Sequence, residues 1–287
     1  MTTIIDGKQL AKKTNEQTKL EVQHLKEMGI TPGLAVVIVG NDEASQRYVR
    51  NKNKTAQRLG INSKVIELAD TITETELIDI VQQLNDDDAI NGILVQDPLP
   101  THIDERKITR KIKPEKDVDG FHPYNVGKLF LDDTTNYPVA CTPKGIMTML
   151  KEYNIDLLGK KAVVIGRSAI VGKPMAALLL NAGASITVLH RYTTDILEYT
   201  KTADVIVAAT GTLHLLQAKS IKKGAVIIDV GQNIDETGHL VGDVDYDDVF
   251  DRAGYITPVP GGVGPMTIAT LMQQTVELTK WGLNSGK

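Results

Sequence analysis

Apolar runs of strand length alternate with amphipathic, helix-like segments along most of the chain. In the first part of the chain the apolar runs predict strands at 34–39, 62–68 and 92–95. The segments around them predict helices at 7–29, 43–59, 74–84 and 104–112. In the second part we predict strands at 162–165, 185–189, 204–208 and 225–230, and helices at 143–153, 175–181, 193–202 and 266–283. Strands that alternate with helices are typical of βαβ units, so each part should contain a parallel sheet.

Two stretches break this alternation. Between Pro114 and Pro143 the periodicity fades while Asp, Asn, Gly and Pro accumulate, which predicts a long functional loop and a crossover between domains. The next helix should begin at Pro143 with Thr142 as its N-cap. The segment TPVPGGVGPMT, residues 257–267, is too rich in Pro and Gly to be regular. The predicted fold class is therefore α/β, with two lobes and a ligand cleft between them.

The composition is that of an ordinary globular protein. Of its 287 residues, 41% are hydrophobic and 24% are charged, and the net charge is -4. We expect no general nucleic-acid partner, because such a partner needs a basic surface. No apolar run reaches the ~20 residues that span a bilayer, and the N-terminus lacks the order of a signal peptide. With Cys141 as the only cysteine, no internal disulfide can form, and we expect a cytoplasmic protein with no membrane partner.

Patterns for metal binding fail on closer reading. Asp243-x-Asp245-x-Asp247 resembles the start of a calcium loop, but the sixth position is Asp248 where that loop needs glycine. The histidines show neither HExxH nor HxxxH spacing, and Cys141 has no catalytic signature around it. We predict no metal site.

The segment VVIGRSAIVGKP, residues 163–174, predicts a seat for a phosphate. A strand should end at Gly166 and a helix should begin near Gly172, which brings free backbone N–H groups and the positive end of a helix dipole together. Ser168 takes the middle glycine position of GxGxxG, and the spacing and Pro174 exclude a Walker P-loop. The alternative to a dinucleotide site is a tight strand-to-helix turn, as in any α/β protein.

The strand that follows favours NADP over NAD. An NAD site usually has an acidic residue about 20 positions after the glycine loop, but strand 185–189 ends in His190-Arg191. Arg191 and Arg167 are suited to a 2′-phosphate because guanidinium groups form charge-assisted hydrogen bonds with it. The alternative is that both arginines are simply solvated.

A second group of candidate residues lies far from the glycine loop. Tyr48 and Lys52 share one face of the predicted helix 43–59, and Ser45 joins that face. A lysine whose pKa is lowered by burial can carry a proton in catalysis. Gln96 ends a strand before a rigid turn, and Asp117 and Asp119 place two carboxyl groups in one loop. The alternatives are a solvated amphipathic helix and carboxyl groups that only form turns.

Eight motifs occur together in one order: SQRYVRNKNK, VQDPLP, KDVDGFHPYNVGKL, CTPKGI, VIGRSAIVGKP, DVGQN, GDV and TPVPGGVGPMT. From about Ile4 to the last helix, the chain resembles the bifunctional methylenetetrahydrofolate dehydrogenase/cyclohydrolase family. The resemblance implies oxidation of 5,10-methylenetetrahydrofolate with NADP, followed by hydrolysis of the methenyl product to 10-formyltetrahydrofolate. It also implies a homodimer. The implied lobes are a catalytic folate-binding lobe at 1–120, with helix 266–287 packed back on it, and a Rossmann-type NADP-binding lobe at 121–265.

The resemblance also implies roles for residues of the folate site. Lys52 looks like the acid/base residue of the hydrolysis step, and Gln96 would hydrogen-bond to it. Tyr48 would stack on the aminobenzoyl ring of the folate, and Asp119 would anchor the pterin. Ser45 would support the same pocket.

Further implied residues contact the dinucleotide. These are Gly166, Arg167, Ser168, Arg191 and Gln232, with Arg191 at the 2′-phosphate and Gln232 at the nicotinamide end. A loop between nicotinamide and folate would contribute the substrate-binding residues Pro258, Gly261 and Gly262.

The chain departs from the family pattern at Asp97, where an apolar residue is usual, and this places a charge near Lys52. Position 191 varies in the family, so use of NAD beside NADP stays open. Two other functions also stay open: an NADP-dependent dehydrogenase of another small molecule, such as a shikimate-type substrate, and a non-catalytic NADP-binding protein.

Overall fold

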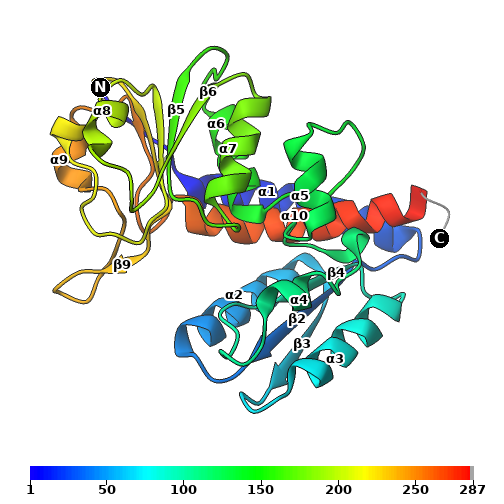
Figure 1. The fold of residues 1–287 in the computed structure, drawn as a ribbon. Coiled ribbons are helices and arrows are strands. Elements are labelled where there is room, and N and C mark those ends of the chain that lie inside the picture. The colour runs from blue at the N-terminus through cyan, green and yellow to red at the C-terminus, as the bar shows by residue number, and fades with distance from the viewer. Residues whose placement is uncertain (285–287) are drawn as a thin grey trace. The chain divides into compact units, whose positions relative to one another are not determined.

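The computed structural model describes residues 1–284, which form two compact units (Figure 1). Unit 1 contains Met1–Lys12 and Thr142–Thr267, and unit 2 contains Lys13–Cys141 and the chain from Ile268 onwards. Each unit has helices and a parallel sheet, as the alternation along the chain predicts. Positions 285–287, the end of the predicted terminal helix range, lie outside the described residues.

Unit 2 is built on a three-stranded sheet with the order β3-β2-β4. The central strand β2 (Gly33–Val39) pairs in parallel with β3 (Asn62–Leu68) and β4 (Gly92–Val95). Every residue of β2 is buried. An apolar run without alternation is what a strand covered on both faces requires, and Figure 1 shows this sheet between helices.

The side chains of β2 alternate between two hydrophobic clusters. Leu34, Val36 and Ile38 pack on one face with residues from α1 (Gly7–Glu27), α2 (Glu43–Leu59) and α10 (Val263–Asn284). The intervening residues of β2 pack on the other face with residues from α3 (Glu74–Asp86) and α4 (Glu105–Thr109). The buried core of unit 2 therefore lies on both sides of its sheet.

Helix α2 has the bounds that the sequence predicts, and its ends show why. The carboxylate of Asp42, the N-cap, accepts a hydrogen bond from the Ser45 backbone N–H at 2.8 Å. The helix ends at Gly60, whose φ of 84° lies in the left-handed region that glycine tolerates best. These two caps fix the residues that α2 presents to the core.

The stretch between Pro114 and Pro143 is more ordered than predicted. It holds a 3₁₀ turn, η1 (Pro114–Lys116), and a helix, α5 (Pro123–Phe130), and α6 (Cys141–Glu152) begins before Pro143. The loop prediction and the assignment of Thr142 as an N-cap were therefore wrong. Asp117 explains the order, because its carboxylate accepts hydrogen bonds from the backbone N–H groups of Phe121 and His122 and from Asn125 Nδ2.

Unit 1 contains a six-stranded parallel sheet with the order β1-β11-β8-β7-β5-β6. Its main strands follow the predicted apolar runs: β5 (Lys161–Ile165), β6 (Ser185–Leu189), β7 (Val205–Ala208) and β8 (Val226–Asp229). Strand β5 lies between β6 and β7. Chain order therefore reverses at β5, which is the Rossmann-type switch point where ligands bind beyond the carboxyl ends of the strands.

The remaining elements of unit 1 are short. The helices are α7 (Gly172–Asn181), α8 (Ile196–Thr200) and α9 (Tyr246–Phe250), and η2 (Ala218–Ser220) is a 3₁₀ turn. β9 (Asn233–Ile234) and β10 (Leu240–Val241) form an antiparallel pair. β1 (Thr3–Ile4) pairs with β11 (Tyr255–Ile256). Among the described residues, no helix combines the length and apolar character needed to cross a membrane.

The unit boundaries differ from the predicted ones, 1–120 and 121–265. The pairing of β1 with β11 joins the first twelve residues to unit 1. Gln274, which is fully buried on α10, donates hydrogen bonds to the carbonyls of Val118 and Val139 and accepts one from the Val139 N–H, which ties residues near 140 to unit 2.

The segment 257–267 is partly regular, because α10 begins at Val263. Pro265 fits there, since N–H groups of the first helical turn have no partner within the helix.

Candidate functional site

Helix α2 and the end of β4 bring Lys52 and Gln96 together. Lys52 is buried, with 6% of its surface exposed, and its Nζ donates a hydrogen bond to Gln96 Oε1 at 3.0 Å. The same Nζ lies 4.8 Å from the centre of the Tyr48 ring. A buried ammonium group is stabilised by an acceptor and by an aromatic face, and it has both here.

Burial lowers the pKa of Lys52 below its ordinary value, while the charges of Asp119 and Asp97 oppose that shift. Burial also raises the pKa of Tyr48 to about 12, with contributions from Cys141 and Asp119. Tyr48 therefore keeps its proton at neutral pH, and Lys52 releases its proton more readily than an exposed lysine does. Lys52 is the group of this pair that is suited to proton transfer.

The backbone carbonyl of Asp97 holds Gln96 in place. It accepts a hydrogen bond from Gln96 Nε2 at 2.8 Å and another from Ser45 Oγ at 3.3 Å. The amide nitrogen of Gln96 is occupied in this way, so its oxygen faces Lys52. Ser45 is buried at the start of α2, and its hydroxyl supports the pocket through Asp97.

The two carboxyl groups of the DVDG loop have different environments. Asp117 accepts the hydrogen bonds that order the chain before α5. Asp119 instead lies close enough to act electrostatically on Lys52 and Tyr48. Burial raises the pKa of Asp119 to about 6, and the charge of Lys52 partly offsets this. Asp119 is thus the carboxyl group of this loop that belongs to the pocket.

In unit 1 the glycine loop leaves β5 at the switch point. Gly166 has a φ of 132°, and a Cβ there would lie 2.4 Å from the carbonyl oxygen of Ala209, which follows β7. Only glycine fits such a close approach. The Ser168 hydroxyl accepts hydrogen bonds from the N–H groups of Val171 and Gly172 at 3.1 and 3.3 Å. The predicted start of α7 near Gly172 is confirmed, and Ser168 braces the loop from within.

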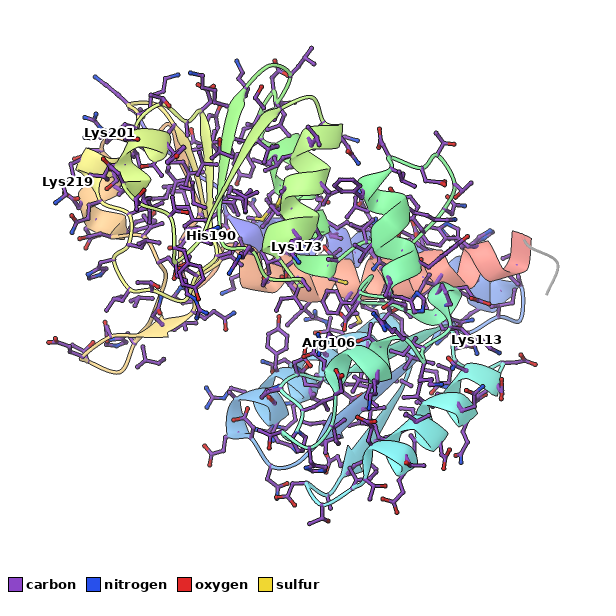
Figure 2. All side chains as sticks on the ribbon, viewed as in Figure 1. Arg106, Lys113, Lys173, His190, Lys201 and Lys219 are labelled. Atoms are coloured by element: carbon purple, nitrogen blue, oxygen red, sulfur yellow. The ribbon has the colours of Figure 1, made fainter. Side chains whose placement is uncertain are left out.

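Two guanidinium groups converge on one tyrosine at the end of β6. Arg191 Nη2 donates a hydrogen bond to the Tyr192 hydroxyl at 2.8 Å. The guanidinium carbons of Arg191 and Arg167 lie 4.8 and 5.5 Å from the centre of the Tyr192 ring. All three side chains are exposed. Figure 2 labels His190, which directly precedes Arg191, and Lys173, on the first turn of α7. Two like charges gathered at one exposed point suit a multiply charged anion.

Most of the chain matches the two domain models of one protein family. Residues 5–119 match the sequence model for the catalytic domain of tetrahydrofolate dehydrogenase/cyclohydrolase, and residues 140–282 match the model for its NAD(P)-binding domain. The chain belongs to the tetrahydrofolate dehydrogenase/cyclohydrolase family. The resemblance read from the motifs is confirmed.

Individual relatives agree over the full length. The bifunctional protein FolD of Lactiplantibacillus plantarum is 60% identical over 281 residues, which cover 98% of both chains. The crystal structure of the bifunctional enzyme FolD from Campylobacter jejuni has a TM-score of 0.97 at 49% identity, covering 98% of this chain and 100% of that one. The Trypanosoma brucei dehydrogenase-cyclohydrolase, crystallised with NADP and an inhibitor, has a TM-score of 0.94 at 39% identity, covering 98% of both chains.

Two buried aspartates, Asp229 and Asp243, brace the loops around the switch point. The Asp243 carboxylate accepts hydrogen bonds from the N–H groups of Thr210 and Gly211 and from Asn233 Nδ2. The Asp229 carboxylate accepts hydrogen bonds from the N–H groups at 231, 243 and 244. Both aspartates stand in motifs of the sequence, Asp229 in DVGQN and Asp243 in GDV, but neither motif indicates this role. Among the described residues, no group of His, Cys, Asp or Glu is arranged to hold a metal ion.

The other predicted residues of unit 1 lie in two places. Gln232 is exposed, and both residues next to it in sequence are held by these aspartates. The Gly231 N–H donates a hydrogen bond to Asp229, and Asn233 Nδ2 donates one to Asp243. Pro258, Gly261 and Gly262 precede α10. The carbonyl of Gly261 accepts a hydrogen bond from the Lys8 N–H, and a Cβ on Gly262 would lie 2.6 Å from the Pro258 carbonyl oxygen. This turn is therefore tightly packed against the start of α1.

Proposed function

We propose that this protein oxidises 5,10-methylenetetrahydrofolate to 5,10-methenyltetrahydrofolate with NADP and hydrolyses the product to 10-formyltetrahydrofolate. The observation that carries the proposal is the buried Lys52, hydrogen-bonded to Gln96 beside Tyr48 and Asp119, in a chain that belongs to this family. The FolD relatives are named as bifunctional, and one related structure was solved with NADP. The two alternatives from the sequence are another small-molecule dehydrogenase and a non-catalytic NADP-binding protein. Neither accounts for a buried lysine that is hydrogen-bonded to Gln96 in this pocket.

Hydrolysis of the methenyl group requires a group that accepts a proton from water, and Lys52 can do this. Water adds to the methenyl carbon, one carbon–nitrogen bond breaks, and a proton is released. Lys52 in its neutral form takes a proton from the attacking water, and burial favours that form. Gln96 Oε1 keeps Nζ in position throughout. We assign the aminobenzoyl ring to Tyr48, because an aromatic side chain can stack on it, and the pterin to Asp119, because a carboxylate can accept its N–H hydrogen bonds. Both residues lie near Lys52.

The residues of unit 1 fit NADP. The loop from Gly166 to Ser168, at the end of β5, suits the pyrophosphate, and Arg167 and Arg191 suit the 2′-phosphate. We assign the nicotinamide end to Gln232 and further substrate contacts to Pro258, Gly261 and Gly262. When bound, NADP supplies the hydride acceptor for the oxidation. Hydride transfer needs alignment rather than a proton carrier, which leaves Lys52 to the second reaction.

Replacing Arg191 with alanine should raise the KM for NADP about 10- to 100-fold while leaving the KM for NAD nearly unchanged. The range corresponds to the ~1.5–3 kcal/mol of a hydrogen bond to a charged group. NAD lacks the 2′-phosphate, so it serves as the control within the same preparation. The measurement is initial-rate kinetics with each dinucleotide. An equal rise in both KM values would show that Arg191 does not bind the 2′-phosphate.

The experiment that tests the proposed function adds methylenetetrahydrofolate with NADP, and then with NAD. It follows the absorbance of reduced dinucleotide and of methenyltetrahydrofolate. We expect reduction with NADP and the transient appearance of the methenyl product. Tight NADP binding without any absorbance change would support the non-catalytic alternative and overturn the proposal.

We also propose a cytoplasmic homodimer formed through unit 1. Strand β6 lies at an edge of the sheet, and Val188 on it, Leu180 on α7 and Leu158 are exposed by 38%, 55% and 74%. A sheet edge flanked by apolar side chains is a suitable surface for pairing with a second copy. Light scattering of the wild type should give the mass of a dimer, and Val188→Lys should give the mass of a monomer. A monomeric wild type would contradict the proposal.

A further inference from the structure

The Asp243 carboxylate connects two loops of unit 1, and the function proposed above gives it no role. Its Oδ2 accepts hydrogen bonds from the Thr210 N–H at 2.7 Å, the Thr210 hydroxyl at 2.9 Å and the Gly211 N–H at 3.2 Å. Its Oδ1 accepts one from Asn233 Nδ2 at 3.0 Å. Asp243 is fully buried, so these four donors replace the water that would otherwise solvate the carboxylate. One side chain thus holds the loop after β7 and the loop after β8.

The backbone of Asp243 is itself held on both sides. Its N–H donates a hydrogen bond to Asp229 Oδ1 at 2.9 Å, and its carbonyl accepts one from the Leu216 N–H at 3.3 Å. The next N–H, of Val244, donates to Asp229 Oδ2 at 3.0 Å. Asp229 is buried at the end of β8. The Asp243 side chain therefore extends from a fixed point of the chain.

The loops that Asp243 holds lie at the end of the sheet where a dinucleotide binds. Strands β5, β7 and β8 are neighbours in a parallel sheet, so the loops that follow them leave the same edge of it. The loop after β7 also touches the glycine loop, because Gly166 leaves no room for a Cβ beside the Ala209 carbonyl. Residues 140–282 match the NAD(P)-binding domain of the family. A shift of either loop would therefore change the shape of the dinucleotide site.

The loop after β8 is closely fitted to Asp243 on either side of Gln232. A Cβ on Gly231 would collide with Asp243 Oδ1, and the Gly231 N–H donates a hydrogen bond to Asp229 Oδ1 at 2.9 Å. Asn233, on the other side of Gln232, is hydrogen-bonded to Asp243. The Gln232 side chain is exposed. Asp243 therefore helps to fix the point from which Gln232, assigned above to the nicotinamide end, extends.

We propose that Asp243 is a positioning residue for the dinucleotide, which holds the loops after β7 and β8 in their binding geometry before NADP or NAD binds. It acts through these loops and through Gln232. Loops that are already ordered bind a ligand more tightly, because binding does not have to order them. The inference rests on the proposed function and adds to it: Arg191 distinguishes NADP from NAD, whereas Asp243 serves both.

Asp243→Asn tests the proposal with little change in the size of the side chain. It replaces one acceptor oxygen with an NH2 group, which is a donor, so either Asn233 or the donors of Thr210 and Gly211 lose their partner. We expect the KM for NADP and the KM for NAD to rise by the same factor, about 10- to 100-fold, as for unpaired buried donors. Arg191→Ala should instead affect NADP alone.

Hydrolysis of added methenyltetrahydrofolate supplies the readout that separates positioning from general loss of structure. This reaction needs no dinucleotide, and the residues assigned to it lie in unit 2. Its rate in Asp243→Asn should therefore stay near that of the wild type. A merely structural role of Asp243 would lower hydrolysis together with dinucleotide binding.

A second variant keeps the test available if Asp243→Asn does not fold. Thr210 is exposed, and Thr210→Val removes the hydroxyl that donates to Asp243 while leaving the backbone N–H in place. Both KM values should rise together in this variant too, by a smaller factor than in Asp243→Asn.

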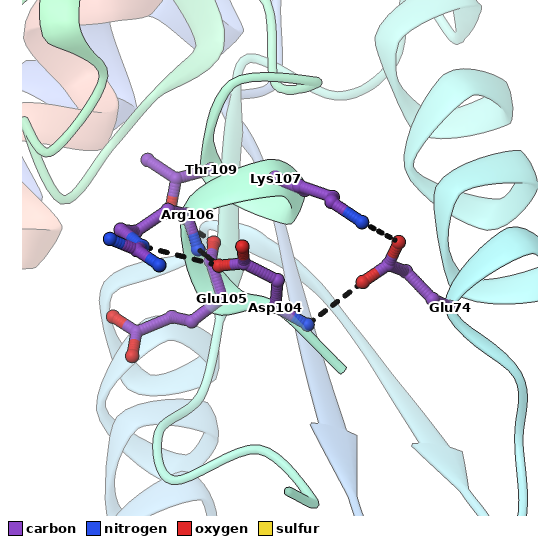
Figure 3. Close-up of polar contacts among 6 residues, drawn as sticks. All are labelled: Glu74, Asp104, Glu105, Arg106, Lys107 and Thr109. Carbon is purple, nitrogen blue, oxygen red and sulfur yellow. Dashed lines mark hydrogen bonds and ion pairs between the residues drawn. The ribbon is translucent and has the colours of Figure 1, made fainter. Parts of the chain in front are cut away.

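Glu74→Gln is the matched control. The Glu74 carboxylate also braces a neighbouring segment, because it accepts hydrogen bonds from the Asp104 N–H and from Lys107 Nζ, each at 2.8 Å (Figure 3). Glu74 lies in unit 2, so its replacement should leave the KM values for NADP and NAD at the wild-type level.

Two results would overturn the proposal. One is a loss of hydrolysis as large as the loss of dinucleotide binding in the Asp243 and Thr210 variants, and the other is wild-type KM values for both dinucleotides in these variants. A wild type that does not reduce NADP would instead count against the proposed function. Calorimetric titration with NADP would then test Asp243 alone, because the dissociation constant should still rise in Asp243→Asn.

Discussion

Lys52→Met is expected to lower the rate of methenyltetrahydrofolate hydrolysis about 10³-fold, within the range found for loss of a general acid or base. Methionine has the length to fill the buried position, but it has no proton to exchange and no donor for Gln96 Oε1. The dehydrogenase reaction needs only alignment of the two ligands, so its rate should fall far less. The measurement is the initial rate of each reaction on the same preparation.

The matched control for this variant is Lys54→Met. Lys54 lies two positions further along α2 and is exposed, so the change removes a lysine charge from the same helix outside the pocket. Both rates should stay close to those of the wild type. If Lys52→Met still hydrolyses methenyltetrahydrofolate at the wild-type rate, Lys52 is not the proton carrier.

Asp119→Ala is expected to reduce kcat/KM about 10- to 100-fold in both reactions, because under the proposed function Asp119 anchors the folate of both. The range again corresponds to the ~1.5–3 kcal/mol of a hydrogen bond to a charged group. This loss should appear mainly in KM, which separates an anchor from a proton carrier. A loss confined to hydrolysis would show that Asp119 acts through Lys52 and does not anchor the pterin.

The pH dependence of the same interaction has a defined sign. Burial raises the pKa of Asp119 to about 6 in the folded protein. The carboxyl group is therefore ionised above that pH and protonated below it. The folate KM of the wild type should rise as the pH falls through 6, and Asp119→Asn should lose this dependence. A wild-type KM that is flat across this range would contradict the assignment.

The parts of the fold that could be predicted are those whose signals are local. The apolar run of β2, the Asp42 cap and the glycine at 60 are enough to place β2 and α2. The pairing of β1 with β11 could not be predicted, because two-residue strands have no periodicity and depend on distant partners. Helix α5 was missed for a related reason, since its start depends on hydrogen bonds to Asp117.

The candidate site divides in the same way. The motifs identify Lys52, Tyr48, Gln96 and Asp119, and the structure brings Lys52 against Gln96 and Tyr48 and within electrostatic range of Asp119. The contacts that support these residues could not be predicted from the sequence. Asp97 was visible as an added charge, but the hydrogen bonds that its carbonyl accepts from Ser45 and Gln96 require the fold. Tyr192, which gathers Arg167 and Arg191, carries no motif of its own.

The central claim is that this protein oxidises methylenetetrahydrofolate and then uses Lys52 to hydrolyse the methenyl product. A single time course tests this claim most directly. Methylenetetrahydrofolate and NADP are mixed with the wild type or with Lys52→Met, and NADPH and methenyltetrahydrofolate are followed in the same sample. In the wild type, NADPH should rise well ahead of methenyltetrahydrofolate, because the latter is consumed. In Lys52→Met the two should rise together in equal amounts. Equal accumulation in both proteins, or no NADPH in either, would contradict the account.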